Sequence, residues 1–184
     1  QARRTLKRGY DRGERDPRLL AVLGLCESEA GDEVAAREYL EAAVRIGPVR
    51  PRANYELARL RLAEFKASPA GTGGRLSVSQ TADVLRPLFA ARADQPPLPE
   101  VYELIAEAWA HSESKPTRAH LAVLHEGVRL FPRRIELVLR GAELHLKHGY
   151  DDAATTLIDV AVLVADDDAA RKRIAALQQQ LGKK

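Results

Sequence analysis

The sequence contains no methionine, a single cysteine and few aromatic residues, and each shortage excludes a class of protein. The lone Cys26 cannot form an intramolecular disulfide, and it rules out zinc sites that need several cysteines. Aromatic residues make up only 5% of the chain, which favours closely packed helices over a sheet. No uncharged apolar run approaches the ~20 residues of a membrane-spanning helix, so we expect no membrane insertion. A globular, all-α protein of 184 residues is the remaining expectation.

The N-terminus lacks both a starting methionine and an apolar segment behind it. We therefore expect a fragment of a longer protein, and no signal peptide is visible in it. Arginine outnumbers lysine by 22 to 7, a bias typical of GC-rich genomes, and we expect a bacterial source. The expected location is soluble, in the cytoplasm or the envelope, with the missing N-terminal part deciding between them.

The net charge of +3 is concentrated at one end of the chain. Residues 1–18 hold seven basic and three acidic side chains, whereas the rest holds 22 basic and 23 acidic ones. No basic stripe with interleaved aromatic residues continues along the chain. Nucleic acid is therefore not an expected partner.

A repeating frame organises most of the chain. Pro48, Pro96, Pro132 and Asp166 each close an apolar helical pattern, and the numbers of successive closing positions differ by 48, 36 and 34. A small or short residue precedes each closing position by five and by twelve places, namely Ala43 and Ala36, Ala91 and Val84, Gly127 and His120, and Ala161 and Ala154. A shared period of about 34 residues follows, with short insertions accounting for the surplus.

Each repeat has the pattern of two helices joined by a turn. The predicted repeats cover about 17–50, 51–97, 98–132 and 133–166, followed by a capping helix over 168–182. Residues 1–16 are expected to be the end of a preceding helix or a basic linker. The Gly-rich stretch 67–76 is the insertion in the second repeat, and we expect it to be a mobile loop that can be shortened at little cost.

These units resemble the tetratricopeptide repeat (TPR), a helix–turn–helix unit of about 34 residues. The first repeat carries the resemblance best, through Leu20, Leu23, Gly24, Gly31, Asp32, Ala36, Leu40, Ala43 and Pro48. The fourth follows it through Ala142, Gly149, Ala154, Ile158 and Ala161. The aromatic residue usual three places after the small one is present only as Trp109, and Glu27, Arg61 and His145 replace it elsewhere. The resemblance implies a right-handed solenoid of about four repeats plus a capping helix.

The resemblance also implies a binding groove lined by the first helix of each repeat. The residues that the family turns toward this groove are here Arg52, Tyr55, Arg59, Glu100, Glu103, Glu107, Glu136 and Glu143. The five glutamates would repel one another unless a cation or a basic partner neutralised them. We therefore expect an extended ligand with a basic stretch over the third and fourth repeats. Charge reversal at Glu103 and Glu107 is expected to abolish its binding and leave the fold intact.

No residue pattern predicts catalysis, a metal or a cofactor. His145 and His148 lie three residues apart on one expected helix, but no third ligand falls in register with them, which favours core or helix-end histidines. The segment 71–74 lacks the Lys-Ser/Thr of a phosphate loop. Cys26 has no histidine at a recognisable spacing.

The resemblance implies a non-catalytic scaffold that binds a protein or peptide. One alternative is an accessory or regulatory C-terminal domain of a larger enzyme, a hydrolase or transferase, whose catalytic part lies upstream. A further alternative is self-association through the two ends of the solenoid.

Overall fold

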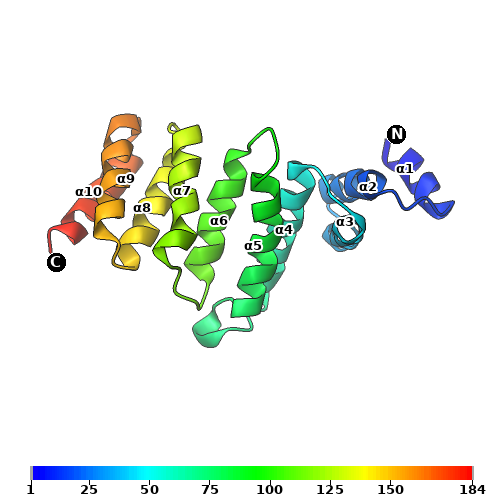
Figure 1. The fold of residues 1–184 in the computed structure, drawn as a ribbon, viewed down its shortest axis with the longest axis horizontal. Coiled ribbons are helices and arrows are strands. Elements are labelled where there is room, and N and C mark those ends of the chain that lie inside the picture. Colours follow the sequence, from blue (N-terminus) through cyan, green and yellow to red (C-terminus); the bar gives the residue numbers. More distant parts are fainter. Residues whose placement is uncertain (1, 184) are drawn as a thin grey trace. The chain divides into compact units, whose positions relative to one another are not determined.

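The computed structural model describes residues 2–183, and helices dominate this range (Figure 1). The helices are α1 (Ala2–Asp11), α2 (Pro17–Glu29), α3 (Glu33–Ile46), α4 (Pro51–Ala67), α5 (Val78–Arg92), α6 (Pro99–His111), α7 (Arg118–Leu130), α8 (Ile135–Lys147), α9 (Asp151–Val164) and α10 (Asp168–Leu181). A 3-10 turn, η1 (Thr72–Gly74), lies between α4 and α5. The described residues contain no strand beyond one isolated bridge, which confirms the all-α prediction.

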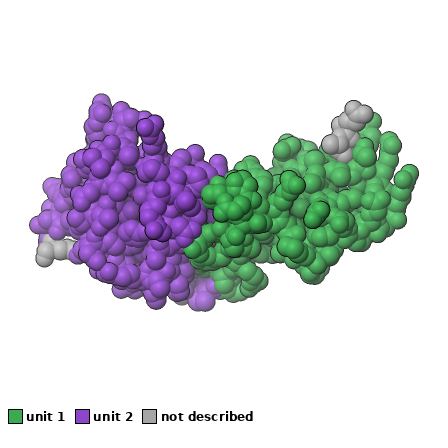
Figure 2. Space-filling model, turned by 45° about the horizontal axis from the view of Figure 1, so that its top comes forward, with its two compact units in different colours: residues 1–70, 79–98 green, residues 71–78, 99–184 purple. Residues whose placement is uncertain are grey.

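The chain divides into two compact units (Figure 2). Unit 1 comprises residues 1–70 and 79–98, and therefore holds α1 to α4 and all but the first residue of α5. Unit 2 comprises residues 71–78 and 99–184, and holds η1 and α6 to α10. Each unit has its own helix contacts and is described separately.

The helix boundaries in unit 1 follow from local cap and turn chemistry. The Asp16 carboxylate accepts hydrogen bonds from the backbone N–H groups of Arg18 and Leu19, and Pro17 occupies the first turn of α2. Gly31 turns the chain with a φ of 83°, a value that a glycine adopts without strain. The Asp32 carboxylate then accepts from Ala35 N–H and caps α3. The N-cap before α2 and the break at Gly31-Asp32 are therefore placed as the sequence predicts.

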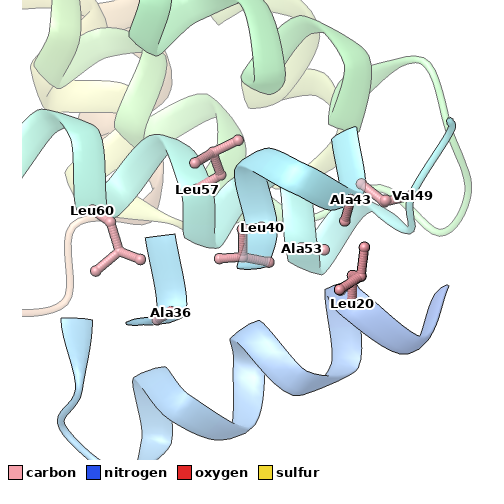
Figure 3. Packing of buried hydrophobic residues seen from close by; sticks show 9 residues of the cluster. Leu20, Ala36, Leu40, Ala43, Val49, Ala53, Leu57 and Leu60 are labelled. Carbon is pink, nitrogen blue, oxygen red and sulfur yellow. The ribbon is translucent and has the colours of Figure 1, made fainter. Parts of the chain in front are cut away.

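The core of unit 1 is built from small and large residues that interlock (Figure 3). Ala36, Leu40 and Ala43 on α3 are fully buried and pack with Leu20 of α2 and Leu57 of α4. The α2–α3 pair is especially close at Gly24, as the resemblance implies. An added Cβ there would lie 2.7 Å from Leu40 Cγ and 3.0 Å from the Ala36 carbonyl oxygen. Only glycine permits this approach.

Two of the departures from the repeat pattern are buried or half-buried polar residues with specific partners in unit 1. Glu27 is 1% exposed, and the Arg3 guanidinium of α1 binds it through two nitrogens. Arg61 donates to the Glu41 carboxylate on α3 and, over 3.0 Å, to the backbone carbonyl of Asp83 on α5. Both side chains therefore connect neighbouring helices where an aromatic residue would only fill space.

The bond from Arg61 also explains how α5 tolerates a proline in its interior. Pro87 has no N–H, so the carbonyl of Asp83, four residues earlier, loses its usual helical donor. Arg61 supplies a donor from α4 instead. The helix consequently runs through Pro87 from Val78 to Arg92.

Unit 2 repeats the same packing logic. An added Cβ at Gly127 of α7 would lie 2.6–2.8 Å from three atoms of Tyr102, which is 1% exposed on α6. His145 of α8, the third polar departure, is fully buried, and its Nδ1 bonds the Gly141 carbonyl over 2.8 Å. His145 is therefore a core histidine, as the sequence favours.

The insertion between α4 and α5 is held by hydrogen bonds within unit 2. Leu76 donates its N–H to the carbonyl of His111 and accepts from Glu113 N–H, both over 2.9 Å. The Glu113 carboxylate accepts in turn from the N–H groups of Thr72 and Val78. Leu76 itself is 1% exposed. Leu76 is therefore packed, whereas residues 67–75 are exposed or half-buried. Shortening at little cost stays a prediction for 67–75, and Leu76 is not part of the segment that can be removed.

Truncating Leu76 is expected to destabilise unit 2. Leu76→Ala removes a fully buried aliphatic group, and such cavities cost about 2–5 kcal/mol of unfolding free energy. Denaturant unfolding followed by Trp109 fluorescence measures the change, because Trp109 is the single tryptophan and lies in unit 2. Val78→Ala is the matched control, since Val78 is 64% exposed and close in sequence. Equal stability of the two variants would restore the loop interpretation.

Candidate binding surface on the first helices

The predicted groove residues lie on the first helix of each helix pair, as the resemblance implies. Arg52, Tyr55 and Arg59 belong to α4 in unit 1. The five glutamates belong to α6 and α8 in unit 2, and they are Glu100, Glu103, Glu107, Glu136 and Glu143. The basic and the acidic halves of the predicted groove thus belong to different units, and each forms a surface of its own.

In unit 1 all three predicted residues line one hollow of about 300 Å³. We name it the basic-aromatic hollow, and it is lined by Leu25, Ser28, Glu29, Arg52, Tyr55, Glu56 and Arg59. Residues 52, 55, 56 and 59 recur at helical spacing, so one face of α4 supplies them. The facing residues come from α2, and Leu25 stands one repeat period before Arg59. The hollow therefore lies between two successive first helices.

Charges at the base of this hollow are fixed by hydrogen bonds. Glu56 is 6% exposed, accepts from Arg59 over 2.8 Å and also accepts from the Ser28 hydroxyl. Burial raises the pKa of Glu56, but the bonds from Arg59 and Ser28 outweigh it, so the pKa lies below its ordinary value. Glu56 is thus ionised at neutral pH. Arg59 is held by it and, over 3.4 Å, by Glu33.

Arg52 and Glu29 are the exposed charges of the basic-aromatic hollow, and Arg52 lies beside its aromatic ring. Its guanidinium carbon lies 5.1 Å from the centre of the Tyr55 ring. No carboxylate within residues 2–183 forms an ion pair with it. A cation above an aromatic ring retains its outward donors, so Arg52 can bind an acidic group and the Tyr55 ring can contact an apolar one.

In unit 2 the predicted glutamates form a row of ion pairs that crosses three first helices. Glu103 of α6 binds Arg134 over 2.9 Å, and Glu107 of α6 binds Arg140 of α8 over 3.3 Å. Arg173 of α10 then binds Glu136 over 2.7 Å and Glu143 over 2.8 Å, both on α8. Arg140 also lies 3.7 Å from Glu136. We name these four glutamates and three arginines the ion-pair row.

The ion-pair row shows that most of the predicted acidic face is neutralised within the chain, contrary to the expectation. Four of the five predicted glutamates already have arginine partners within the chain, so mutual repulsion does not demand a basic ligand. Reversing Glu103 and Glu107 would place lysines against Arg134 and Arg140, and it would therefore disturb the row as well as any ligand. Glu100 has no ion-pair partner among the described residues, and it leaves this face acidic at the α6 end.

Arg134, Arg140 and Arg173 were not predicted as part of this surface, although the period contained a signal for them. Residues about one period apart face each other on successive first helices, and the pairs Glu103–Arg134, Glu107–Arg140 and Glu143–Arg173 are separated by 31, 33 and 30 residues. Opposite charges separated by about one period therefore predict ion pairs between repeats. The same rule covers Arg118 and Asp152, 34 residues apart on α7 and α9.

In the described part of the chain, neither clustered metal ligands nor membrane-spanning helices are found. Residues 2–183 contain no group of three or more His, Cys, Asp or Glu side chains placed to hold a metal ion. Helices long and apolar enough to cross a lipid bilayer are likewise absent from this range. The free thiol of Cys26 is partly buried.

A solved structure of a known protein supports the fold. The crystal structure of a thermophilic TPR protein from Thermus thermophilus aligns with a TM-score of 0.52 and 23% sequence identity. The alignment covers 89% of this chain and 81% of that one. No protein-family model and no curated protein sequence matches the chain.

This chain thus has a TPR-like fold, with its helices in sequential antiparallel pairs, and the expected resemblance is confirmed at the level of fold. At the observed identity the likeness concerns the fold alone. TPR folds are in general scaffolds for protein interaction.

Proposed function

We propose that the protein is a non-catalytic scaffold that binds a protein or an extended peptide through its first-helix faces. The observation that supports this most is the basic-aromatic hollow, where three residues selected from the sequence surround one concavity with Leu25. An exposed cation, an aromatic ring and an aliphatic side chain there offer the contact types that dominate binding energy at protein interfaces. The ligand places an acidic or aromatic residue in this hollow.

The same proposal assigns a basic stretch of the ligand to the face of unit 2. Glu100 is the carboxylate that supports this, because no arginine within residues 2–183 forms an ion pair with it. The ion-pair row is exposed enough for a ligand to exchange with it, since the Glu136 and Glu143 side chains are 54% and 43% exposed. Exposed pairs of this kind are worth about 0–1 kcal/mol each. The α6 end, where Glu100 has no ion-pair partner among the described residues, is the favoured position for a basic ligand residue.

A peptide selection on the full chain tests the basic-aromatic hollow. Random peptides displayed on phage are selected on the protein, and the enriched peptides are measured by fluorescence anisotropy. Arg52→Ala with Tyr55→Ala is expected to weaken their binding by at least about tenfold, because truncating anchors of these types costs about 1–2 kcal/mol or more. Glu100→Lys is expected to weaken the binding of those enriched peptides that carry a basic stretch.

The control variant is Arg45→Ala with Ile46→Ala, which removes an exposed cation and an exposed aliphatic residue from the second helix α3. It should bind the same peptides as the parent protein does. Enrichment of no peptide, or equal binding to both double variants, would contradict the proposal for this face.

A further inference from the structure

A hollow of about 640 Å³ lies between α8 and α10 in unit 2. Its lining comes from one stretch of α8 and from the length of α10, with Glu143, Leu146, Lys147, Arg173, Ala176, Leu177, Gln180 and Lys183. None of the predicted groove residues other than Glu143 belongs to it. We name it the α8–α10 hollow.

The shape of this hollow follows the axis of α10. Its α10 residues 173, 176, 177 and 180 recur at spacings of three and four, so they form one open stripe along the helix. From Arg173 to Gln180 the stripe extends about 10 Å, or two helical turns. The floor is apolar, because Leu146 and Leu177 are each only 5% exposed. An open stripe along a helix, with an apolar floor beside it, suits a second helix laid into the groove.

The charges around the α8–α10 hollow favour an acidic occupant. Glu143 and Arg173 neutralise each other over 2.8 Å. Lys147 and Lys183 have no ion-pair partner among the described residues, and they leave the rim with two uncompensated positive charges. Two lysines without ion-pair partners in the described range, beside an apolar floor, attract acidic side chains and repel basic ones.

We propose that the α8–α10 hollow binds an acidic amphipathic helix of a partner protein. Its apolar face contacts Leu146, Ala176 and Leu177, and its carboxylates pair with Lys147 and Lys183. An extended strand is a poorer occupant, because the helices on either side have no free backbone edge to pair with it. The inference rests on the proposed scaffold function, but it concerns a different surface from the basic-aromatic hollow and a helical partner.

Two synthetic probes test the inference on the full chain. Both are amphipathic helical peptides with leucines at the same i, i+3, i+4 and i+7 positions, and their polar positions are all Glu in one and all Lys in the other. Fluorescence anisotropy is expected to show binding of the Glu peptide only. Because the rim charges are exposed, raising the salt from about 50 mM to about 500 mM should weaken that binding by several-fold.

Variants locate the binding on this surface. Lys147→Glu with Lys183→Glu is expected to weaken the binding of the Glu peptide by at least about tenfold, since two attractions become repulsions. Ala176→Trp should weaken this binding to a similar degree, because the indole would fill the α8–α10 hollow. The matched control, Arg133→Glu with Lys172→Glu, makes the same change in net charge at exposed positions outside the hollow.

The outcomes separate this inference from the general proposal. Equal binding of both peptides, or loss of binding in the control variant to the same degree, would overturn the acidic-helix inference. So would self-association of the chain that Ala176→Trp abolishes, because a second copy would then be the occupant. Failure of Arg52→Ala with Tyr55→Ala to affect the selected peptides would instead count against the basic-aromatic hollow.

Discussion

Replacing Gly24 with leucine is expected to lower the free energy of unfolding of unit 1 by more than about 3 kcal/mol. A Cβ at this position would lie 2.7 Å from Leu40 Cγ and 3.0 Å from the carbonyl oxygen of Ala36. The carbonyl belongs to the backbone of α3 and cannot rotate away as a side chain can. The new side chain must therefore separate α2 from α3, and it exposes the core that Leu20 and Leu40 share.

Hydrogen exchange is the appropriate measurement, because it reports each unit separately. Amides of α2 and α3 should lose protection, whereas those of α8 and α9 in unit 2 should keep it. Val22→Leu is the control, since Val22 lies on the same helix and is 45% exposed, and its effect should stay within about 0.5 kcal/mol. Parent-like protection of α2 and α3 in Gly24→Leu would show that the two helices are not closely packed at this point.

Gly24 illustrates which parts of the fold the sequence could predict. Its smallness, the turn at Gly31 and the cap at Asp16 are properties of a few consecutive residues, and the repeat period places equivalent signals further along the chain. Gly149, the predicted break between α8 and α9, has the positive φ of 80° that such a turn requires. Local signals of this kind do not depend on how the chain packs elsewhere.

The partners of the polar residues inside the fold are harder to predict from the sequence. Glu27, Arg61 and His145 stand where the repeat pattern has an aromatic residue, and nothing adjacent in sequence explains them. The partners of Glu27 and Arg61 are 24 and 20 residues away, at Arg3 and Glu41, whereas His145 bonds the Gly141 carbonyl of its own helix. A polar residue in place of the usual aromatic one therefore indicates a hydrogen bond inside the fold. For Glu27 and Arg61, only the structure identifies the partner.

The sequence reasoning about the insertion and the acidic face missed contacts for a related reason. Gly-rich composition predicted a loose segment over 67–76, yet Leu76 is buried and bonded to the end of α6. The glutamates of the face were selected without the arginines one period away. In both cases the missing information was a contact between repeats. Arg52, Tyr55 and Arg59 could be selected because the resemblance assigns one face of their helix to the groove.

Acidification is expected to destabilise unit 2 through a cluster of histidines. The His125 and His145 rings meet edge to face with centres 4.8 Å apart, and Tyr150 contacts His145 at 6.2 Å. His145 is fully buried, and since its Nδ1 faces the Gly141 carbonyl, Nδ1 carries the proton. Its Nε2 has no hydrogen-bond partner among the described residues, and neither has the buried Nε2 of His148.

Protonation would place a positive charge in this apolar site. Burial lowers the pKa of all three histidines, and nearby cations lower it further, Arg129 for His125 and Lys147 and Lys115 for His148. For His145 the bond to Gly141 opposes the lowering of the pKa in part, and Arg118 faces the same site while it pairs with Asp152. The folded pKa of each histidine thus lies below that of the unfolded chain.

The direction of the pH effect follows from this difference. Between the two pKa values the unfolded chain binds more protons than the folded one, so stability rises with pH there. The contribution of the cluster is complete above about pH 6.5, the ordinary histidine pKa, and is lost as the pH falls toward the folded values. One histidine contributes at most about 1.4 kcal/mol per pH unit.

The midpoint of thermal unfolding of unit 2, followed by Trp109 fluorescence at pH values between about 7.5 and 5, measures this effect. The parent midpoint should fall steadily below about pH 6.5. His145→Phe keeps an aromatic ring between His125 and Tyr150 but cannot take up a proton, so its midpoint should fall less steeply. His111→Gln removes a histidine outside the cluster and should retain the parental slope. If His145→Phe loses stability with acid as steeply as the parent does, protonation of His145 is not what destabilises unit 2, and the acid sensitivity belongs to other groups.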